Sequence, residues 1–202
     1  MTVDKNIEYL VGNKAKLNFV LEPFSAQIIN FLDDLSKSLD NKFNNKNFPD
    51  LKALSFFCRK NNILNLRDKH KNKDSIRFGL GLLFHITPSN IPTNFAYSLI
   101  FGLINGNSNV VKVPTKKFDE IKIICKSINS ILDKKKYLQI KNMITVVRYN
   151  STDQLLTKNF SAICDARLIW GGDKTITDIK KFETKAKNID IEFIGIGTNL
   201  EN

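Results

Sequence analysis

The sequence is poor in the residues on which several common kinds of protein site depend. Its 202 residues include only three cysteines, Cys58, Cys125 and Cys164, and no two of them are closely spaced. An odd and sparse set of this kind argues against a disulfide framework and favours a reducing compartment. The two histidines, His70 and His85, have no cysteine or carboxylate partners at metal-ligand spacing, so we expect no metal site.

The sequence also lacks the segments that direct a chain into or through a membrane. Its beginning, "MTVDKNIEYL", does not show the basic-then-apolar pattern of a signal peptide. The most apolar zone, residues 78–103, is interrupted by "TPSNIP" and by flanking glycines, which leave pieces too short to cross a bilayer. We therefore expect a cytoplasmic protein with no integral membrane segment.

The charge is strongly unbalanced, with a formal net value of +11. Such a charge attracts polyanions such as nucleic acid, anionic lipid or phosphate-bearing ligands. The lysines, however, are scattered among asparagine and isoleucine along the whole chain, which indicates a lysine-biased composition rather than a basic face. The sequence has no base-reading helix motif and no stacking-aromatic patch, so we do not expect a nucleic-acid partner. With 42% hydrophobic residues, the chain can form a substantial core.

Two regions with different hydrophobic patterns follow one another along the chain. Residues 1–75 are predicted to form a helical segment, with amphipathic patterns over residues 25–39 and 50–66. Residues 76–202 are predicted to form an α/β domain in which strands and helices alternate. The expected strands are 76–86, 108–114, 143–149, 166–171 and 189–195, and the expected helices are 93–105, 118–133, 151–160 and 173–187. This alternation predicts a doubly wound, mainly parallel sheet.

In an open parallel sheet, ligands bind beyond the carboxyl ends of the strands. Three polar or glycine-rich stretches are expected there, "TPSNIP", "KVPTKK" and "WGGDK". Asn90 is flanked by Pro88 and Pro92, which should stiffen its loop, and its side-chain amide could then stabilise an oxyanion. The alternative is that Asn90 only caps the helix that begins near Thr93. Lys112 could meet a phosphate or a ribose hydroxyl, or could simply extend to solvent from a strand end.

A glycine pair precedes one of the predicted helices. Gly171 and Gly172, with Asp173 as the candidate N-cap, would allow a ligand to approach a helix N-terminus closely. No GxxxxGK[ST] phosphate loop is present, and residues 79–81, Gly-Leu-Gly, are expected inside a strand rather than in a dinucleotide fingerprint. Glu192 in the last strand is either a base or a solvent-facing carboxylate. Cys125 and Cys58 are expected in the core, and nothing beside Cys164 indicates an activated thiolate.

The segments "GLGLLFHITPSNIPTNFAYSLIFGLINGNSNVVKVP" and "RLIWGGDKTITDIKKF" resemble the long-chain fatty acyl-CoA reductases of the LuxC type, within the aldehyde dehydrogenase superfamily. "LKALSFFCRKNNILNL" resembles the helical segment that those reductases carry upstream. The resemblance implies that Asn90 stabilises the oxyanion of a thiohemiacetal and that Lys112 meets the adenosine ribose or its 2′-phosphate. It places Gly171 and Gly172 beside the cofactor, NADPH or alternatively NADH. Glu192 falls near the superfamily's Glu-Leu-Gly-Gly base, although "IEFIGIG" departs from that pattern.

The resemblance also implies what this chain lacks. The family's nucleophilic cysteine belongs to a later segment, so the chain is expected to be the amino-terminal part of a longer reductase, without the catalytic domain and inactive alone. The implied substrate is a fatty acyl-CoA. A homo-oligomer or companion acyl-transferring subunits are implied as partners of the full-length protein. The aldehyde could serve light emission, lipid synthesis or surface-polymer modification. The alternative function is a non-catalytic nucleotide-binding or scaffold module.

Overall fold

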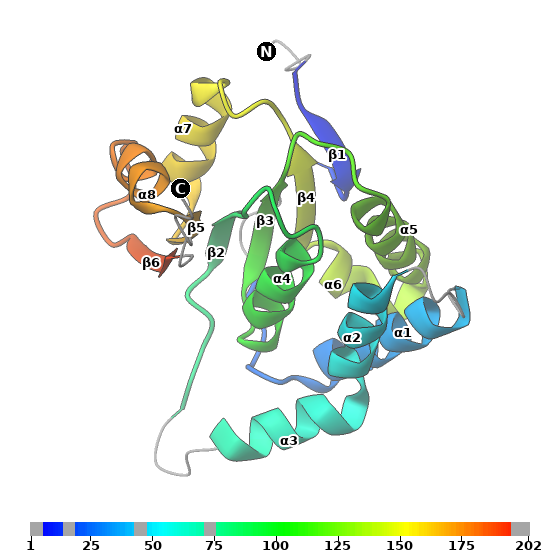
Figure 1. Ribbon diagram of the computed structural model, residues 1–202. Coiled ribbons are helices and arrows are strands. Elements are labelled where there is room, and N and C mark those ends of the chain that lie inside the picture. Colours follow the sequence, from blue (N-terminus) through cyan, green and yellow to red (C-terminus); the bar gives the residue numbers. More distant parts are fainter. Residues whose placement is uncertain (1–5, 14–18, 43–47, 71–75, 195–202) are drawn as a thin grey trace.

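The computed structural model describes residues 6–13, 19–42, 48–70 and 76–194, and it shows a six-stranded sheet between two layers of helices (Figure 1). In spatial order the strands are β1 (Glu8–Val11), β4 (Ile144–Arg148), β3 (Ser108–Val113), β2 (Leu82–Ile86), β5 (Ala166–Gly171) and β6 (Ile189–Ile194). β1 pairs antiparallel with β4, and each of the other neighbouring pairs is parallel. The predicted α/β class with a mainly parallel sheet is confirmed.

The helices divide between the two faces of the sheet (Figure 1). One face is covered by α1 (Ala26–Lys42), α2 (Pro49–Cys58), α3 (Lys60–His70), α4 (Asn94–Ile104), α5 (Asp119–Leu132), the 3₁₀ turn Lys135–Tyr137 and α6 (Leu138–Lys141). The other face is covered by α7 (Gln154–Ile163) and α8 (Asp173–Lys180). Because strand side chains alternate, Val111 packs in the core of the first face and its neighbour Val110 packs in the core of the second.

The helix predicted over residues 25–39 is confirmed as α1. Its apolar positions all lie in the core, each no more than 5% exposed: Ile28, Ile29, Phe31, Leu32, Leu35 and Leu39. The pattern over residues 50–66 forms two helices, α2 and α3, because Arg59 between them has an extended backbone with φ −57° and ψ 137°. α3 continues to His70, four residues beyond the end of the predicted pattern.

The amino-terminal segment contributes a strand that the sequence analysis missed. β1 has only four residues at the edge of the sheet, and of these only Val11 is buried, so its hydrophobic pattern is too short to recognise. α1, α2 and α3 share one hydrophobic core with α4 and α5. The division of the chain into a helical segment and an α/β domain at residue 75 remains a prediction.

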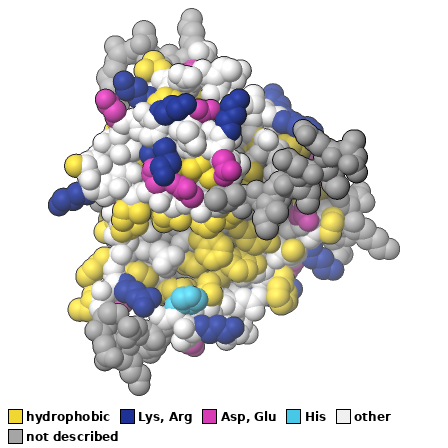
Figure 2. Space-filling model, turned by 60° about the vertical axis from the view of Figure 1, so that its left-hand side comes forward, with side chains coloured by type: hydrophobic (Ala, Val, Ile, Leu, Met, Phe, Trp, Pro, Cys, Tyr) yellow, Lys and Arg dark blue, Asp and Glu magenta, His cyan; other side chains and the backbone are white. Residues whose placement is uncertain are grey.

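The strand predicted over residues 76–86 is shorter than expected. Only Leu82–Ile86 forms β2, and Ile76, Phe78 and Leu80 are 86%, 74% and 51% exposed. Figure 2 shows that hydrophobic side chains gather across one face of the molecule. The alternating apolar residues of this segment therefore lie before β2, exposed to solvent, and do not belong to the sheet.

Gly81 explains where β2 begins. Its φ of +127° is unfavourable for other residues and ends the extended run before the strand. A Cβ atom added at Gly81 would collide with the carboxylate of Asp165, which accepts a hydrogen bond from the Leu82 amide at 2.8 Å. The Gly-Leu-Gly stretch at residues 79–81 thus lies before the strand, and the prediction that placed it inside was wrong.

The apolar zone at residues 78–103 is divided between an extended segment, β2, a loop and α4. α4 has eleven residues, eight of which are buried against the sheet and the neighbouring helices. No helix within the described ranges combines the length and the apolar character needed to cross a bilayer.

Candidate functional site

A cavity of about 1000 Å³ lies at the carboxyl ends of β2, β3 and β5. Its wall is formed by the three loops that the sequence indicated as ligand-binding, and every predicted site residue lines it: Asn90, Lys112, Gly171, Gly172 and Glu192. Hydroxyl groups from Thr115, Ser151, Thr157 and Thr175 add to the polar lining. The structure thus brings together residues that are separated by as many as 102 positions in the sequence.

The Asn90 loop leaves β2 and is anchored to β3. The Thr87 hydroxyl donates a hydrogen bond of 2.8 Å to the Lys112 carbonyl oxygen, and Pro88 and Pro92 restrict the backbone on both sides of Asn90. Asn90 is exposed at the cavity. α4 begins at Asn94 with Thr93 in the N-cap position, so Asn90 is not the N-cap residue. Its side-chain amide is available to a ligand.

Lys112 lies near the end of β3 and is mostly buried. Its Nζ atom is 5.0 Å from the centre of the Tyr149 ring, a distance typical of a cation–π contact. Within the described part of the chain no carboxylate forms an ion pair with it, and burial lowers its pKa from the usual value. A cation held on an aromatic ring at a cavity wall is better placed for an anionic or hydroxyl-bearing ligand than for solvent.

The two glycines at the end of β5 have different structural roles. A Cβ added at Gly171 would lie 3.0 Å from the Thr175 side chain, so this glycine allows α8 to pack closely. A Cβ added at Gly172 would meet nothing within 4 Å, so this position borders open space. Gly172 itself is the N-cap of α8, and its φ of −79° is open to any residue. Asp173 is the first residue of the helix, so its prediction as N-cap was wrong.

Glu192 borders the cavity from β6, but it already has a partner. Its Oε1 atom lies 2.6 Å from Nζ of Lys180 on α8, and this hydrogen bond raises the pKa of Lys180. The contact holds the carboxylate at the surface between β6 and α8. It gives no support to Glu192 as a free base, and that role remains a prediction.

The three cysteines are all buried free thiols. Burial raises the pKa of Cys58 and Cys125 to about 12 and that of Cys164 to about 11. The thiolate is the nucleophilic form of cysteine, so none of these thiols is activated at neutral pH. Among the residues that the structure describes, no group of three or more His, Cys, Asp or Glu side chains could hold a metal ion.

A buried polar chain leads from the centre of the sheet to the cavity, and the sequence analysis missed it. His85 on β2 is fully buried; its Nε2 atom lies 2.9 Å from Oδ1 of Asn109, and its Nδ1 atom lies 2.7 Å from Oγ of Ser98. Ser98 on α4 accepts a hydrogen bond of 3.2 Å from Nε1 of Trp170, which lines the cavity. The sequence signal was a histidine inside an otherwise apolar strand.

The hydrogen-bond partners fix the protonation state of this chain. Asn109 donates from Nδ2 to the Asn107 carbonyl oxygen at 2.7 Å, so its Oδ1 atom faces His85 as an acceptor. His85 therefore carries its proton on Nε2 and accepts at Nδ1 from the Ser98 hydroxyl. Burial lowers the pKa of His85 to about 4, which keeps the ring neutral. Gly102 makes room for the chain, because a Cβ there would collide with Oδ1 of Asn109.

Solved structures similar to this one include lactaldehyde and benzaldehyde dehydrogenases. Lactaldehyde dehydrogenase from Escherichia coli is 13% identical with a TM-score of 0.61, over 84% of this chain and 39% of that one. PnpE from Pseudomonas sp. WBC-3 is 14% identical with a TM-score of 0.59, over the same shares. An NAD-dependent benzaldehyde dehydrogenase from Corynebacterium glutamicum is 10% identical with a TM-score of 0.54, over 93% of this chain and 54% of that one. This chain spans about two fifths of the length of the first two.

The sequence itself matches one protein family. No curated protein matches the chain. The family described as acyl-CoA reductase (LuxC) matches residues 21–196, which include each of the predicted site residues and most of the described structure. The match and the aldehyde dehydrogenase fold agree with the resemblance drawn from the sequence. The chain belongs to the LuxC family of acyl-CoA reductases.

Proposed function

We propose that this chain is the cofactor-binding, amino-terminal part of a longer reductase that converts long-chain fatty acyl-CoA to fatty aldehyde with NADPH. Two observations support the proposal. The chain belongs to an acyl-CoA reductase family, and it spans only 39% of the length of similar dehydrogenases such as lactaldehyde dehydrogenase. Its own three thiols are buried and protonated, so the nucleophile would come from a catalytic domain outside these 202 residues.

The observation that carries the proposal is the single cavity shared by Asn90, Lys112 and Gly172. The cavity fits a phosphorylated nucleotide, because it offers a cation that pairs with no carboxylate of the described residues and open space at the N-terminus of α8. The loop after Lys112 carries the exposed Lys116 and Lys117, which do not line the cavity, and no carboxylate before Asp119. This local excess of positive charge favours a 2′-phosphate, and therefore NADPH over NADH.

The residues of this chain would bind and orient the reacting groups. A cysteine of the catalytic domain would attack the thioester carbonyl and expel CoA, and NADPH supplies the hydride that releases the aldehyde. The stiff loop at Asn90 would hold a side-chain N–H where negative charge develops on the carbonyl oxygen. Lys112 would hold the adenosine end of the cofactor, and Gly172 would allow its pyrophosphate to approach α8. Glu192 could act as a base only after leaving Lys180.

Titration of this chain with NADPH and NADH tests the cofactor assignment. We expect Lys112→Ala to weaken NADPH binding about 10- to 100-fold, since a hydrogen bond to a charged group contributes about 1.5–3 kcal/mol. Lys122→Ala, an exposed lysine on α5 that does not line the cavity, is the matched control and should leave affinity unchanged. A larger loss for NADPH than for NADH indicates contact with the 2′-phosphate. Equal affinity in wild type and Lys112→Ala would contradict the assignment.

A further inference from the structure

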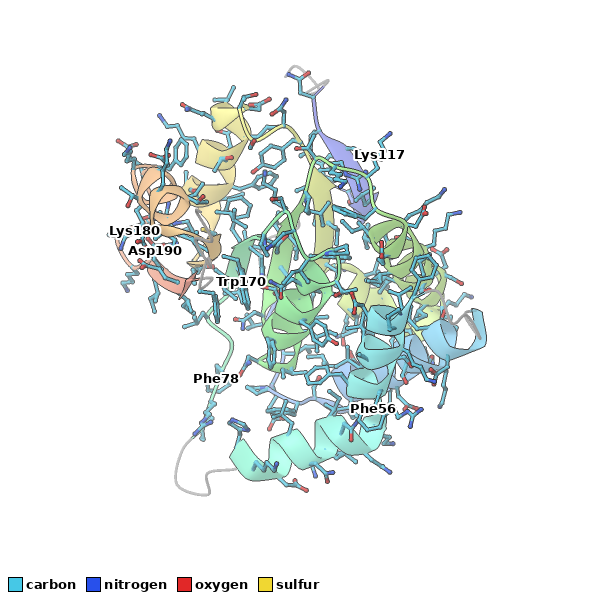
Figure 3. All side chains as sticks on the ribbon, in the orientation of Figure 1. Phe56, Phe78, Lys117, Trp170, Lys180 and Asp190 are labelled. Carbon is cyan, nitrogen blue, oxygen red and sulfur yellow. The ribbon has the colours of Figure 1, made fainter. Side chains whose placement is uncertain are left out.

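Trp170 is held rigidly at the cavity by two different contacts. Its indole ring stacks on Phe193 of β6 with 3.9 Å between centroids and 8° between planes, and its Nε1–H donates to Ser98 on α4. Figure 3 shows Trp170 at the end of β5, beside α4. Because Phe193 covers one face of the indole, a ligand in the cavity could stack only on the other face. The ring therefore forms a fixed flat surface in the cavity wall.

The contacts behind Ser98 prevent the indole from turning. Ser98 is 1% exposed, and its hydroxyl donates to His85, which is itself fixed by Asn109. Ser98 is therefore held in place by His85, and rotation of Trp170 would break the hydrogen bond of its Nε1–H to the Ser98 hydroxyl.

Trp170 and Lys112 approach the cavity from opposite faces of the sheet. Ile86 on β2 pairs with Lys112 on one side and with Ile169 on the other, so the two strand ends flank the Asn90 loop. Lys112 shares its face with Val110, which packs with α7 and α8. Trp170 faces α4 instead. A ligand that contacts both Lys112 and Trp170 must therefore pass over the carboxyl edge of the sheet, where Gly172 leaves open space.

We propose, building on the cofactor assignment above, that Trp170 is the surface on which the nicotinamide ring stacks and that Ser98 positions it. A dinucleotide has two flat ring systems joined by a pyrophosphate. Its two ends could therefore contact Lys112 on one face of the sheet and Trp170 on the other, with the pyrophosphate crossing the sheet edge between them. The ring that carries the hydride must lie beside the Asn90 loop, where the acyl carbonyl would be. Oxidised nicotinamide is a cation, and tryptophan is the strongest aromatic partner of cations.

The single tryptophan of the sequence makes the contact directly observable. NADP⁺ does not absorb where indole emits, so energy transfer does not account for a loss of Trp170 fluorescence on binding NADP⁺. We expect the quenching to saturate, with the same midpoint concentration of NADP⁺ as calorimetry gives. We also expect a charge-transfer absorption band from the stacked indole and nicotinamide rings. Adenosine 2′,5′-bisphosphate lacks the nicotinamide and should bind without quenching. NADP⁺ that binds by calorimetry but leaves the emission unchanged would overturn this inference and keep the cofactor site, whereas absence of any binding would overturn both.

Variants separate a positioning role from a loss of folding. We expect Trp170→Leu to weaken NADP⁺ binding about 5- to 30-fold, a range that corresponds to one to two kcal/mol, and to leave the affinity for adenosine 2′,5′-bisphosphate unchanged. Ser98→Ala should also weaken NADP⁺ binding relative to adenosine 2′,5′-bisphosphate binding, and it should reduce the quenching of Trp170 fluorescence. Ser127→Ala is the control, because Ser127 is equally buried on α5 and its hydroxyl has no hydrogen-bond partner among the residues that the structure describes. Equal losses for both ligands would reject Trp170 as a nicotinamide contact.

Discussion

The buried chain at His85 makes a specific prediction about stability and pH. His85 is fully buried between Ser98 and Asn109, and burial lowers its pKa from 6.5 to about 4. The folded chain therefore resists protonation of this ring while the unfolded chain accepts it. The stabilisation from neutral His85 is complete above pH 6.5, and it is lost as the pH falls from about 6.5 to about 4.

The magnitude follows from the two pKa values. A difference of roughly 2.5 pKa units, at about 1.4 kcal/mol for each unit, corresponds to about 3 kcal/mol of unfolding free energy. Urea unfolding at a series of pH values, followed by Trp170 fluorescence, measures it. A His85→Gln variant removes the titrating ring and retains an amide donor and acceptor. We expect the wild type to lose about 3 kcal/mol more than His85→Gln between pH 7 and pH 4. Parallel pH profiles for the two proteins would refute the buried neutral state.

Two further predictions concern the site and the sheet. In the complete reductase, Asn90→Ala should lower kcat by a factor on the order of 10²–10³ in an NADPH oxidation assay; unchanged turnover would remove the oxyanion role. Arg167 is 2% exposed, and its guanidinium contacts both carboxylate oxygens of Asp190 at 2.7 and 2.6 Å. Asp190→Ala should therefore lower the free energy of unfolding, measured by chemical denaturation, by about 3–5 kcal/mol. Asp178→Ala breaks an exposed pair with Lys181 and should cost far less than Asp190→Ala, and equal losses in the two variants would contradict the buried pairing.

The strands of the parallel sheet were predictable from the sequence because their hydrophobic runs are long and lie between clear helices. β3 and β5 were found with the correct residues, and their polar ends then placed Lys112 and Gly172 at one edge. The same reasoning failed for residues 76–81. Composition alone does not show that Gly81 has a positive φ and that the apolar residues before it remain exposed.

The parts of the site that were missed depend on contacts between distant segments. Ser98 and Trp170 are 72 residues apart, and neither carries a local pattern that predicts their hydrogen bond. His85 is a polar residue in an apolar strand, but its partner Asn109 could be identified only from the register of β2 beside β3. For Glu192 the sequence could not show that Lys180, on the neighbouring helix, would occupy its carboxylate.

The central claim is that the cavity at the carboxyl ends of the strands holds the cofactor. Titration of the ¹⁵N-labelled chain with NADPH, observed by NMR, tests it residue by residue. We predict the largest amide shifts in residues 86–91, 112–115 and 170–175, around the cavity. A second cavity, of about 830 Å³, lies at the amino-terminal end of β2 between α3 and α4, with Arg67, Arg77 and Phe101 in its wall. Shifts concentrated around this second cavity, with none at Lys112 or Gly172, would contradict the account.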